Sequence, residues 1–200
     1  MVLLAFVATM LCTSRMLATT VVAPPFEELV NVSDYIVRAT VKSVHSEYAS
    51  PGSKMIVTYV ELDVKEVITG TPPSPLVLRM LGGEVDGKRM TVEGAPQFVV
   101  GDEDILFVKG NGKNFTPLTA MMHGRYPIIR DKATGRAFVE RDDHAPLKST
   151  AEVNTPMDDH AHASDAKATA ATEAAALTPE QFAAAIRAAV NPNFQRKHEQ

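Results

Sequence analysis

Two short stretches of the chain combine carboxylates with imidazoles, side chains that bind zinc, nickel and copper in proteins. The first is Asp142-Asp143-His144 and the second is Asp158-Asp159-His160-Ala161-His162. Their spacing is not that of a structural zinc site, so two interpretations stay open: a metal site or a solvated polar linker. We favour the linker. The residues that would form the metal site are His144, Asp158, Asp159, His160 and His162.

The sequence holds no clear pattern for nucleophilic catalysis or phosphate binding. A serine hydrolase places its nucleophile on a sharp elbow between two glycines, whereas Ser53 has only Gly52 beside it. Cys12 lies in an N-terminal apolar run that we expect to be removed. The glycine-rich residues 110–114 lack the Lys-Ser/Thr ending of a phosphate loop and a following helix. We therefore predict no catalytic residue, no cofactor-binding residue and no cofactor.

The composition is that of a chain that folds around a core. The 200 residues are 45% hydrophobic and 22% charged, which are ordinary values for a globular protein. With 20 basic and 24 acidic residues the formal net charge is −4, whereas a nucleic-acid-binding surface needs a basic stripe. The single cysteine excludes a disulfide framework and a four-thiolate zinc site. We therefore predict no nucleic-acid partner.

Residues 1–18 have the layout of a secretory signal peptide. The uncharged apolar run from Val2 to Cys12 is too short to cross a bilayer, and the small residues near Ala18 suit a cleavage site. No later stretch is long enough to span a membrane, so the mature chain is predicted to be secreted or periplasmic. A buried N-terminal strand or helix is the alternative that stays open.

Residues 24–140 are predicted to form the folded domain, which begins with a short helix near Phe26. Hydrophobic residues alternate with polar ones from Tyr35 and again from Ile56, across a Pro-Gly turn, as in a hairpin with one wet face. On that face Arg38 and Lys42 oppose acidic residues, and we interpret these charges as cross-strand pairs. The acidic residues of these pairs are Glu61 and Asp63.

Further short strands, bounded by Gly and Pro, follow as far as residue 140. Their regular spacing indicates a mainly β protein, and we predict a small antiparallel β-barrel of the OB type. The predicted core residues are Tyr35, Val37, Val41, Val60, Leu62, Val64, Leu78 and Phe107.

The composition changes after residue 140, where aromatic residues become scarce and alanine becomes frequent. We predict a flexible, disordered linker over 141–176. Thr178-Pro179 gives a helix start, and the spacing of Leu177, Phe182 and Ile186 predicts one amphipathic helix over 177–190.

A pattern of packing and turn residues runs through the segment 26–130. Its residues are Leu29, Asp34, Ile36, Val37, Ala39, Val41, Val64, Val67, Gly70, Gly82, Gly83, Gly94, Ala95, Pro96, Phe98, Gly101, Glu103 and Phe107. With this pattern the segment resembles a domain of uncharacterised secreted bacterial proteins, and its arrangement is similar to OB-type barrels, including the netrin-like domains of metalloprotease inhibitors. Those inhibitors reach the target's metal with a disulfide-bonded N-terminal cysteine, which the mature chain lacks, so the resemblance implies a fold rather than this mechanism.

These observations favour an exported, non-enzymatic binding or interaction module. Its partner is predicted to be a protein or a small ligand, and loop 82–101 is the expected place of contact, because loops on a rigid scaffold carry function. Two alternatives stay open. One is an exported metal-binding protein that uses the Asp/His linker, and the other is a secreted enzyme inhibitor, by analogy of fold alone.

Overall fold

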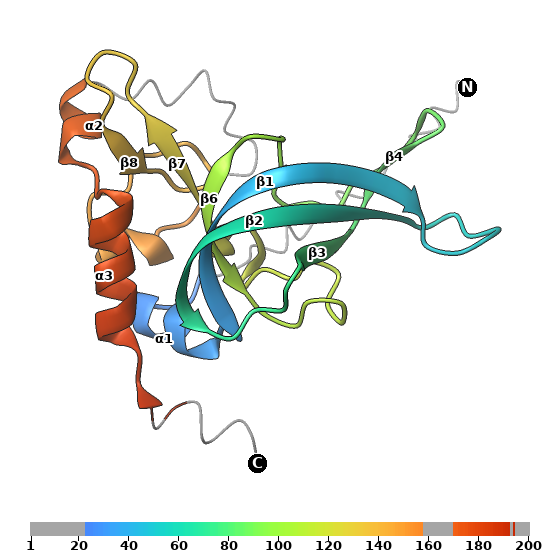
Figure 1. Cartoon of the computed structure of the whole chain (residues 1–200), viewed down its shortest axis with the longest axis horizontal. Coiled ribbons are helices and arrows are strands. Elements are labelled where there is room, and N and C mark those ends of the chain that lie inside the picture. Colours follow the sequence, from blue (N-terminus) through green and yellow to red (C-terminus); the bar gives the residue numbers. More distant parts are fainter. Residues whose placement is uncertain (1–22, 158–169, 193, 195–200) are drawn as a thin grey trace, which may run out of the picture.

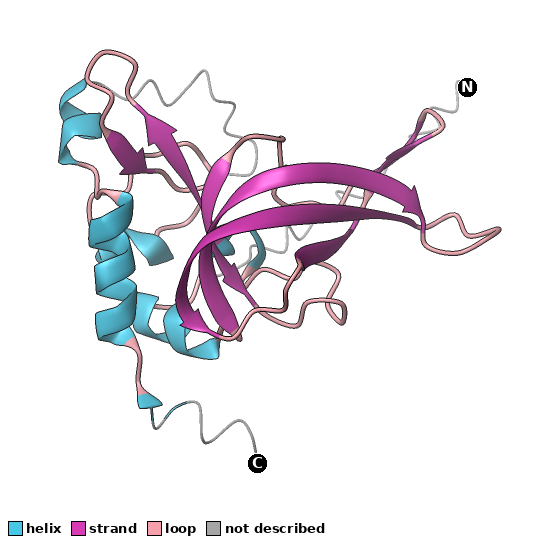
Figure 2. Ribbon diagram, in the orientation of Figure 1, coloured by secondary structure: helices cyan, strands magenta, loops and turns pink. Residues whose placement is uncertain are grey.

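The computed structural model describes residues 23–157, 170–192 and 194 (Figure 1). Six strands form one antiparallel sheet in the order β3-β2-β1-β6-β7-β8, and β4 and β5 form a separate hairpin (Figure 2). The prediction of a mainly β, antiparallel protein with a C-terminal helix is confirmed. No helix in these ranges has the length and apolar character needed to cross a membrane. The elements are α1 (Phe26–Val32), β1 (Tyr35–Tyr48), β2 (Ile56–Gly70), β3 (Leu76–Leu81), β4 (Gly83–Val85), β5 (Lys88–Met90), β6 (Glu103–Val108), η1 (Met121–Gly124), β7 (Arg125–Arg130), β8 (Ala137–Val139), η2 (Thr150–Asn154), α2 (Ala170–Ala175) and α3 (Pro179–Ala189).

Strands β1 and β2 form a long ribbon that projects beyond β6, β7 and β8 (Figure 1). The ribbon runs from the pair Tyr35–Gly70 to the pair Tyr48–Ile56, so the predicted hairpin is confirmed. On its other side β1 pairs with β6 only as far as Thr40. The sheet therefore has a wide base on the side of β6, β7 and β8 and a narrower arm, in which β3 pairs with β2 from Val57 to Leu62.

The closed barrel predicted from the sequence is not formed, because no sheet among the described residues joins its two end strands, β3 and β8. The segment after β6 covers the edge of β3 instead. The N–H of Leu81 donates to the carbonyl of Phe115 at 2.7 Å. The Asn111 side chain donates to the carbonyl of Val77 at 2.8 Å and accepts from the N–H of Arg79 at 3.2 Å. Loop and side-chain hydrogen bonds thus take the place of strand pairing.

Each face of the sheet carries a hydrophobic core. On the helix-covered face, α1 and α3 pack over the strands around Phe107, Tyr126 and Phe182. On the loop-covered face, the loop 91–102 packs Ala95 and Phe98 against the core residues of β1, β2, β3 and β6. The predicted core residues are confirmed as buried, apart from the half-buried Val64 at the border of the loop-covered core. Of this set, Phe107 belongs to the helix-covered core.

The C-terminal helix α3 is part of the helix-covered core. It begins at Pro179 because Thr178 and Gln181 form a capping box, in which each side chain accepts from the other residue's backbone N–H. Its apolar face is fully buried at Phe182 and Ile186. The Phe182 ring lies 4.9 Å from the Tyr126 ring, measured between centroids.

The two ends of the domain are joined through Asn31, in the last turn of α1. Its side-chain amide donates to the carbonyl of Ala189 at 2.9 Å, and its side-chain oxygen accepts from the N–H of Asn191 at 2.7 Å. These bonds connect α1 to the end of α3.

The structure differs from the predicted linker at residues 141–157 and 170–176, which pack onto the domain. Leu147 and Val153 are fully buried in the helix-covered core, and the carbonyl of Leu147 accepts from the N–H of Leu177 at 2.7 Å. These few apolar residues hold the segment although its overall composition is polar. Residues 158–169, like the predicted signal peptide over 1–18, lie outside the described residues.

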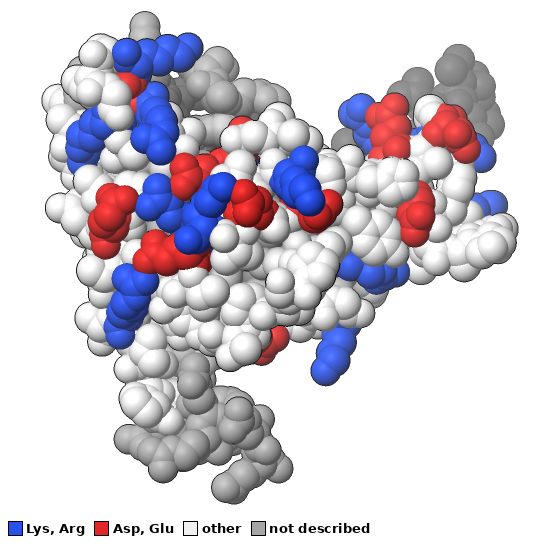
Figure 3. All heavy atoms as spheres, viewed as in Figure 1, with Lys and Arg blue, Asp and Glu red and all other residues white. Residues whose placement is uncertain are grey.

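Acidic and basic side chains alternate over the face seen in Figure 3. Lys42 contacts Glu61 at 2.6 Å, which confirms that predicted cross-strand pair. Arg38 instead contacts Glu103 at 2.6 Å and Glu180 at 2.9 Å. The Lys42–Glu61 pair lies at the surface, whereas Arg38 and Glu103 are only 17% and 20% exposed.

Candidate functional site

A cleft of about 410 Å³ opens between the loop before β6, strand β7 and the segment after β8. We call it the Arg125 cleft. Val99 and Ile129 on its wall are 59% and 37% exposed, so part of its apolar lining faces solvent. Other lining residues are Pro96, Pro127, Asp102, Glu103, Asp142 and His144.

Strand register places the central charges of the cleft on one face. Leu106 of β6 lies opposite Arg125 of β7, and Asp104 lies opposite Pro127. Because side chains alternate along a strand, Asp104 and Arg125 share the face of Leu106, which is the loop-covered face. The chain reaches β6 through Gly101, whose φ of +96° suits glycine.

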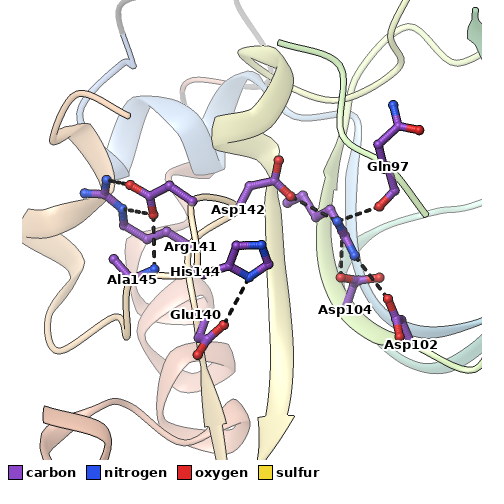
Figure 4. A network of polar contacts seen from close by, with 10 residues as sticks. Gln97, Asp102, Asp104, Glu140, Arg141, Asp142, His144 and Ala145 are labelled. Carbon is purple, nitrogen blue, oxygen red and sulfur yellow. Dashed lines mark hydrogen bonds and ion pairs between the residues drawn. The ribbon is translucent and has the colours of Figure 1, made fainter. Parts of the chain in front are cut away.

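Arg125 is bound by groups from three segments of the chain, and Figure 4 labels three of these partners, Gln97, Asp104 and Asp142. Its Nε donates to Asp104 Oδ1 at 2.9 Å, and its Nη1 donates to Asp142 Oδ1 at 3.1 Å. Nη1 also donates to the Gln97 carbonyl at 2.7 Å. The Phe98 ring lies against the guanidinium, with 4.9 Å between its centroid and Cζ. Arg125 therefore fixes the loop 91–102 and the segment after β8 to the sheet.

The cleft has more carboxylates than cations at its centre. Besides its two hydrogen-bonded carboxylates, Arg125 has Asp102 Oδ2 at 3.6 Å from Nη2. Burial raises the pKa of Asp104 to about 6, against the lowering effect of Arg125, and it also raises the pKa of Asp142. Asp104 Oδ2 is buried without a hydrogen-bond partner among the described residues. One guanidinium thus serves three carboxylates, and excess negative charge remains.

Two further ionic contacts lie beside the cleft, in the segment after β8 (Figure 4). Arg141 pairs with Asp143 and donates to the carbonyl of Glu152 at 3.2 Å. His144 Nδ1 lies 3.7 Å from Glu140 Oε2. Burial, followed by the nearby carboxylates, raises the pKa of Glu140 to about 7. His144 has a φ of +65°, which is uncommon for a residue other than glycine.

The predicted metal ligands are only partly within the described residues. His144 lies at the cleft, with Glu140 as its nearby carboxylate. In the ranges that the structure describes, no three His, Cys, Asp or Glu side chains are arranged to hold a metal ion. The other predicted ligands, Asp158, Asp159, His160 and His162, lie outside the described residues.

Sequence reasoning missed Arg125 and Asp104, the central pair of the cleft. One signal was available, because Asp104 directly precedes the apolar run Ile105–Val108 and belongs to the same strand. A carboxylate in a strand that is covered on both faces needs a buried partner. Nothing in the residue spacing indicated that this partner would be Arg125, because only the folded strand pairing brings the two together.

A second hollow, of about 540 Å³, shares Ala95, Pro96 and Gln97 with the Arg125 cleft and lies on the other side of these residues. We call it the ribbon groove, because β1 and β2 line it with Val44 and Val60. Its remaining lining comes from β3, the β4–β5 hairpin and the loop 91–98. The predicted contact loop 82–101 therefore borders both hollows.

No family model matches the chain, and a search of curated proteins finds no significant match.

Proposed function

We propose that the protein is an exported, non-enzymatic binding module whose Arg125 cleft takes a positively charged side chain of a partner protein. The observation that carries the proposal is the charge imbalance of the cleft, where Asp102, Asp104 and Asp142 share a single guanidinium. A cation that enters the cleft supplies the missing positive charge. Attraction between charges is stronger in a partly buried site than in bulk water.

The walls of the cleft support a lysine or arginine as the occupant. These side chains have long apolar stems below their charged heads. The exposed Val99 and Ile129 offer apolar contact for such a stem. Val100, 59% exposed beside Val99, extends the apolar surface. Exposed apolar residues that adjoin polar groups are found at protein-binding surfaces.

The charged groups of the cleft are paired with one another, which supports binding rather than catalysis. The donors of Arg125 are directed to three carboxylates and to the Gln97 carbonyl. Such a network holds the loop 91–102 in one position, and a preformed surface lowers the entropy that binding must overcome.

The relation to OB-type barrels also stays a proposal. It is supported by the strongly paired ribbon β1–β2 within a mainly β, antiparallel fold. An experimental structure checks it. N-terminal sequencing of the protein from its native host checks export: the proposal expects a first residue near 19, and an intact Met1 on cytoplasmic protein contradicts it.

Site-specific photo-crosslinking in the native host tests the binding function. A photoreactive phenylalanine analogue replaces Val99 at the cleft in one variant, and in the control it replaces Met55, which is 50% exposed near the tip of the arm. We expect a discrete adduct at position 99 alone, joined to a partner segment that carries a lysine or arginine. No adduct at 99, or equal adducts at both positions, overturns the proposal.

The charge contribution is tested in the same assay with Asp102→Asn. Its side chain is 47% exposed and lies at the edge of the network, so the fold tolerates the change. The matched control is Asp63→Asn, on the ribbon, where the carboxylate is 57% exposed and contacts Lys65. We expect the adduct yield to fall severalfold with Asp102→Asn only. Equal yields in the two variants reject a cationic ligand.

A further inference from the structure

The outer half of β1 has an open edge. The last backbone contacts on that side join Val41 to Gly101 and Asp102. From Ser43 to Tyr48 the strand pairs with β2 alone, among the residues that the structure describes. A strand edge with unpaired N–H and C=O groups is a template for another strand.

Along a strand, successive residues direct their backbone N–H and C=O groups to opposite sides. This alternation identifies the unpaired backbone groups at the inner end of the edge. Val41 directs its N–H and C=O away from β2, toward the loop before β6. A β-bulge between Val41 and Ser43 shifts the alternation by one residue. Val44, opposite Val60, therefore has the same orientation as Val41 and directs its backbone groups to the open edge.

At the outer end of the edge, the hydrogen bonds again show which residues direct their backbone groups outward. Tyr48 lies opposite Ile56, whose carbonyl accepts from the N–H of Gly82, on the side away from β1. The pair Tyr48–Ile56 is therefore a non-hydrogen-bonded pair, and Tyr48 directs its backbone groups outward. Ser46, two residues before it, does the same. Three alternate residues of β1 thus present free donors and acceptors along one line.

We propose that this edge pairs with the same edge of a second copy of the chain, antiparallel and centred on Ser46. The two Ser46 residues then lie opposite each other, and Val44 of each copy lies opposite Tyr48 of the other. All of these residues direct their backbone groups to the shared edge, so the register satisfies the hydrogen bonds of both strands. The result is a two-fold symmetric contact, the commonest arrangement among oligomers.

The side chains on one side of the strand favour a second copy as the occupant. In this register His45 of one copy lies opposite Glu47 of the other, and symmetry repeats the pair. The two side chains are 71% and 51% exposed and already lie on one side of the strand, with 3.9 Å between Nε2 and Oε2. Directly opposite residues of antiparallel strands are close enough to interact. The chain therefore carries an imidazole and a carboxylate, which can form a hydrogen bond with each other, at the required spacing.

The other side of the strand faces the ribbon groove, where Lys88 of the same copy contacts the Tyr48 ring, with 5.9 Å between Nζ and the ring centroid. Val44 and Ser46 line the ribbon groove, and Val44 is 38% exposed. In the proposed contact Tyr48 of the second copy covers Val44, so apolar surface is buried twice. The contact involves none of the Arg125 cleft and does not depend on the function proposed for it.

A charge exchange at the edge tests this register. His45→Glu sets Glu against Glu in a symmetric pair, and Glu47→Lys sets Lys against His. We expect sedimentation equilibrium to give the mass of two chains for the unchanged protein and of one chain for each variant. An equimolar mixture of the two variants forms the pairs Glu–Lys and Glu–His, so we expect the mass of two chains to return. A single-chain mass for the unchanged protein at its highest soluble concentration overturns the proposal.

A backbone change provides a second test. Ser46→Pro removes an N–H that β2 does not use, whereas Ser46→Ala keeps it. We expect the proline variant to sediment as one chain and the alanine variant as two, with circular dichroism spectra that report the same fold. If charge and proline variants all keep the mass of two chains, or if the mixture stays at one, the interface lies elsewhere and the proposal is wrong.

Discussion

The two faces of the sheet bury their charges to different depths. On the helix-covered face Arg38 is 17% exposed, and its partners Glu103 and Glu180 are 20% and 71% exposed. On the loop-covered face Arg125 is 10% exposed and Asp104 is fully buried. Two helices cover the first face largely with apolar side chains, whereas the loop over the second face contributes the carbonyl and ring that contact Arg125. Apolar contacts thus dominate one face, and the other depends more on a paired buried charge.

The largest loss of stability is expected from a substitution on the helix-covered face. Phe182→Ala removes a fully buried ring that contacts Phe107 and Tyr126. The free energy of unfolding, measured in urea, should fall by about 4 kcal/mol. Phe98→Ala on the loop-covered face removes a half-buried ring and should cost about 1 to 2 kcal/mol. Equal losses would mean that the loop covers its face as tightly as the helices cover theirs.

The next largest loss of stability is expected when the buried charge of Arg125 is removed. Arg125→Met leaves Asp104 and Asp142 without their cation, and the free energy of unfolding should fall by about 3 kcal/mol. The matched control is Arg187→Met, which breaks a surface pair with Glu66 whose side chains are 47% and 33% exposed. This control should cost less than about 1 kcal/mol. A loss at Arg125 as small as that of the control would mean that the network contributes little to the stability of the loop-covered face.

A smaller effect is expected from pH, again on the loop-covered face. Because burial raises the pKa of Asp104 to about 6, this group stabilises the fold fully below its unfolded pKa of about 4. That contribution is lost as the pH rises through 6. The free energy of unfolding should therefore fall between pH 4 and pH 7, by on the order of 1 kcal/mol or more. Asp104→Asn should flatten this part of the pH profile, and an unchanged slope would show that other groups cause it.

The smallest effect is expected from zinc. Among the described residues the cleft offers His144 and Glu140 as a pair, too few ligands for a tight site. Calorimetry with added zinc should therefore leave the melting temperature unchanged. A rise in the melting temperature, abolished by the double variant His160→Ala and His162→Ala, would support the metal-site interpretation instead, because a ligand that binds only the folded state stabilises it.

The local patterns of the sequence predicted the strands and the last helix well. Period-two alternation predicted the hairpin β1–β2, and the capping signal at Thr178 predicted the start of α3. Both depend on neighbouring residues. The pairing of Asp104 with Arg125 depends on register between strands, which no local pattern encodes.

The amino-acid composition predicted the organisation of the chain less well than the local patterns did. It misassigned residues 141–157, because a segment needs only a few buried anchors, in this case Leu147 and Val153, to become part of a core. The predicted barrel failed for a related reason. Short strands bounded by Gly and Pro do not reveal whether the last sheet edge meets a strand or, as at Asn111, a loop.

The bonds from Asn31 to Ala189 and Asn191 have a consequence for the order of events during synthesis. They join residues 158 and 160 positions apart, and Phe26 meets Phe182 across a similar separation, with ring centroids 5.9 Å apart. Contacts of such high sequence separation form slowly, because a long loop must close first. Helix α1 leaves the ribosome before α3, so it cannot make these contacts until α3 has emerged. A nascent or truncated chain without α3 therefore exposes Phe107 and Tyr126 to chaperones and proteases.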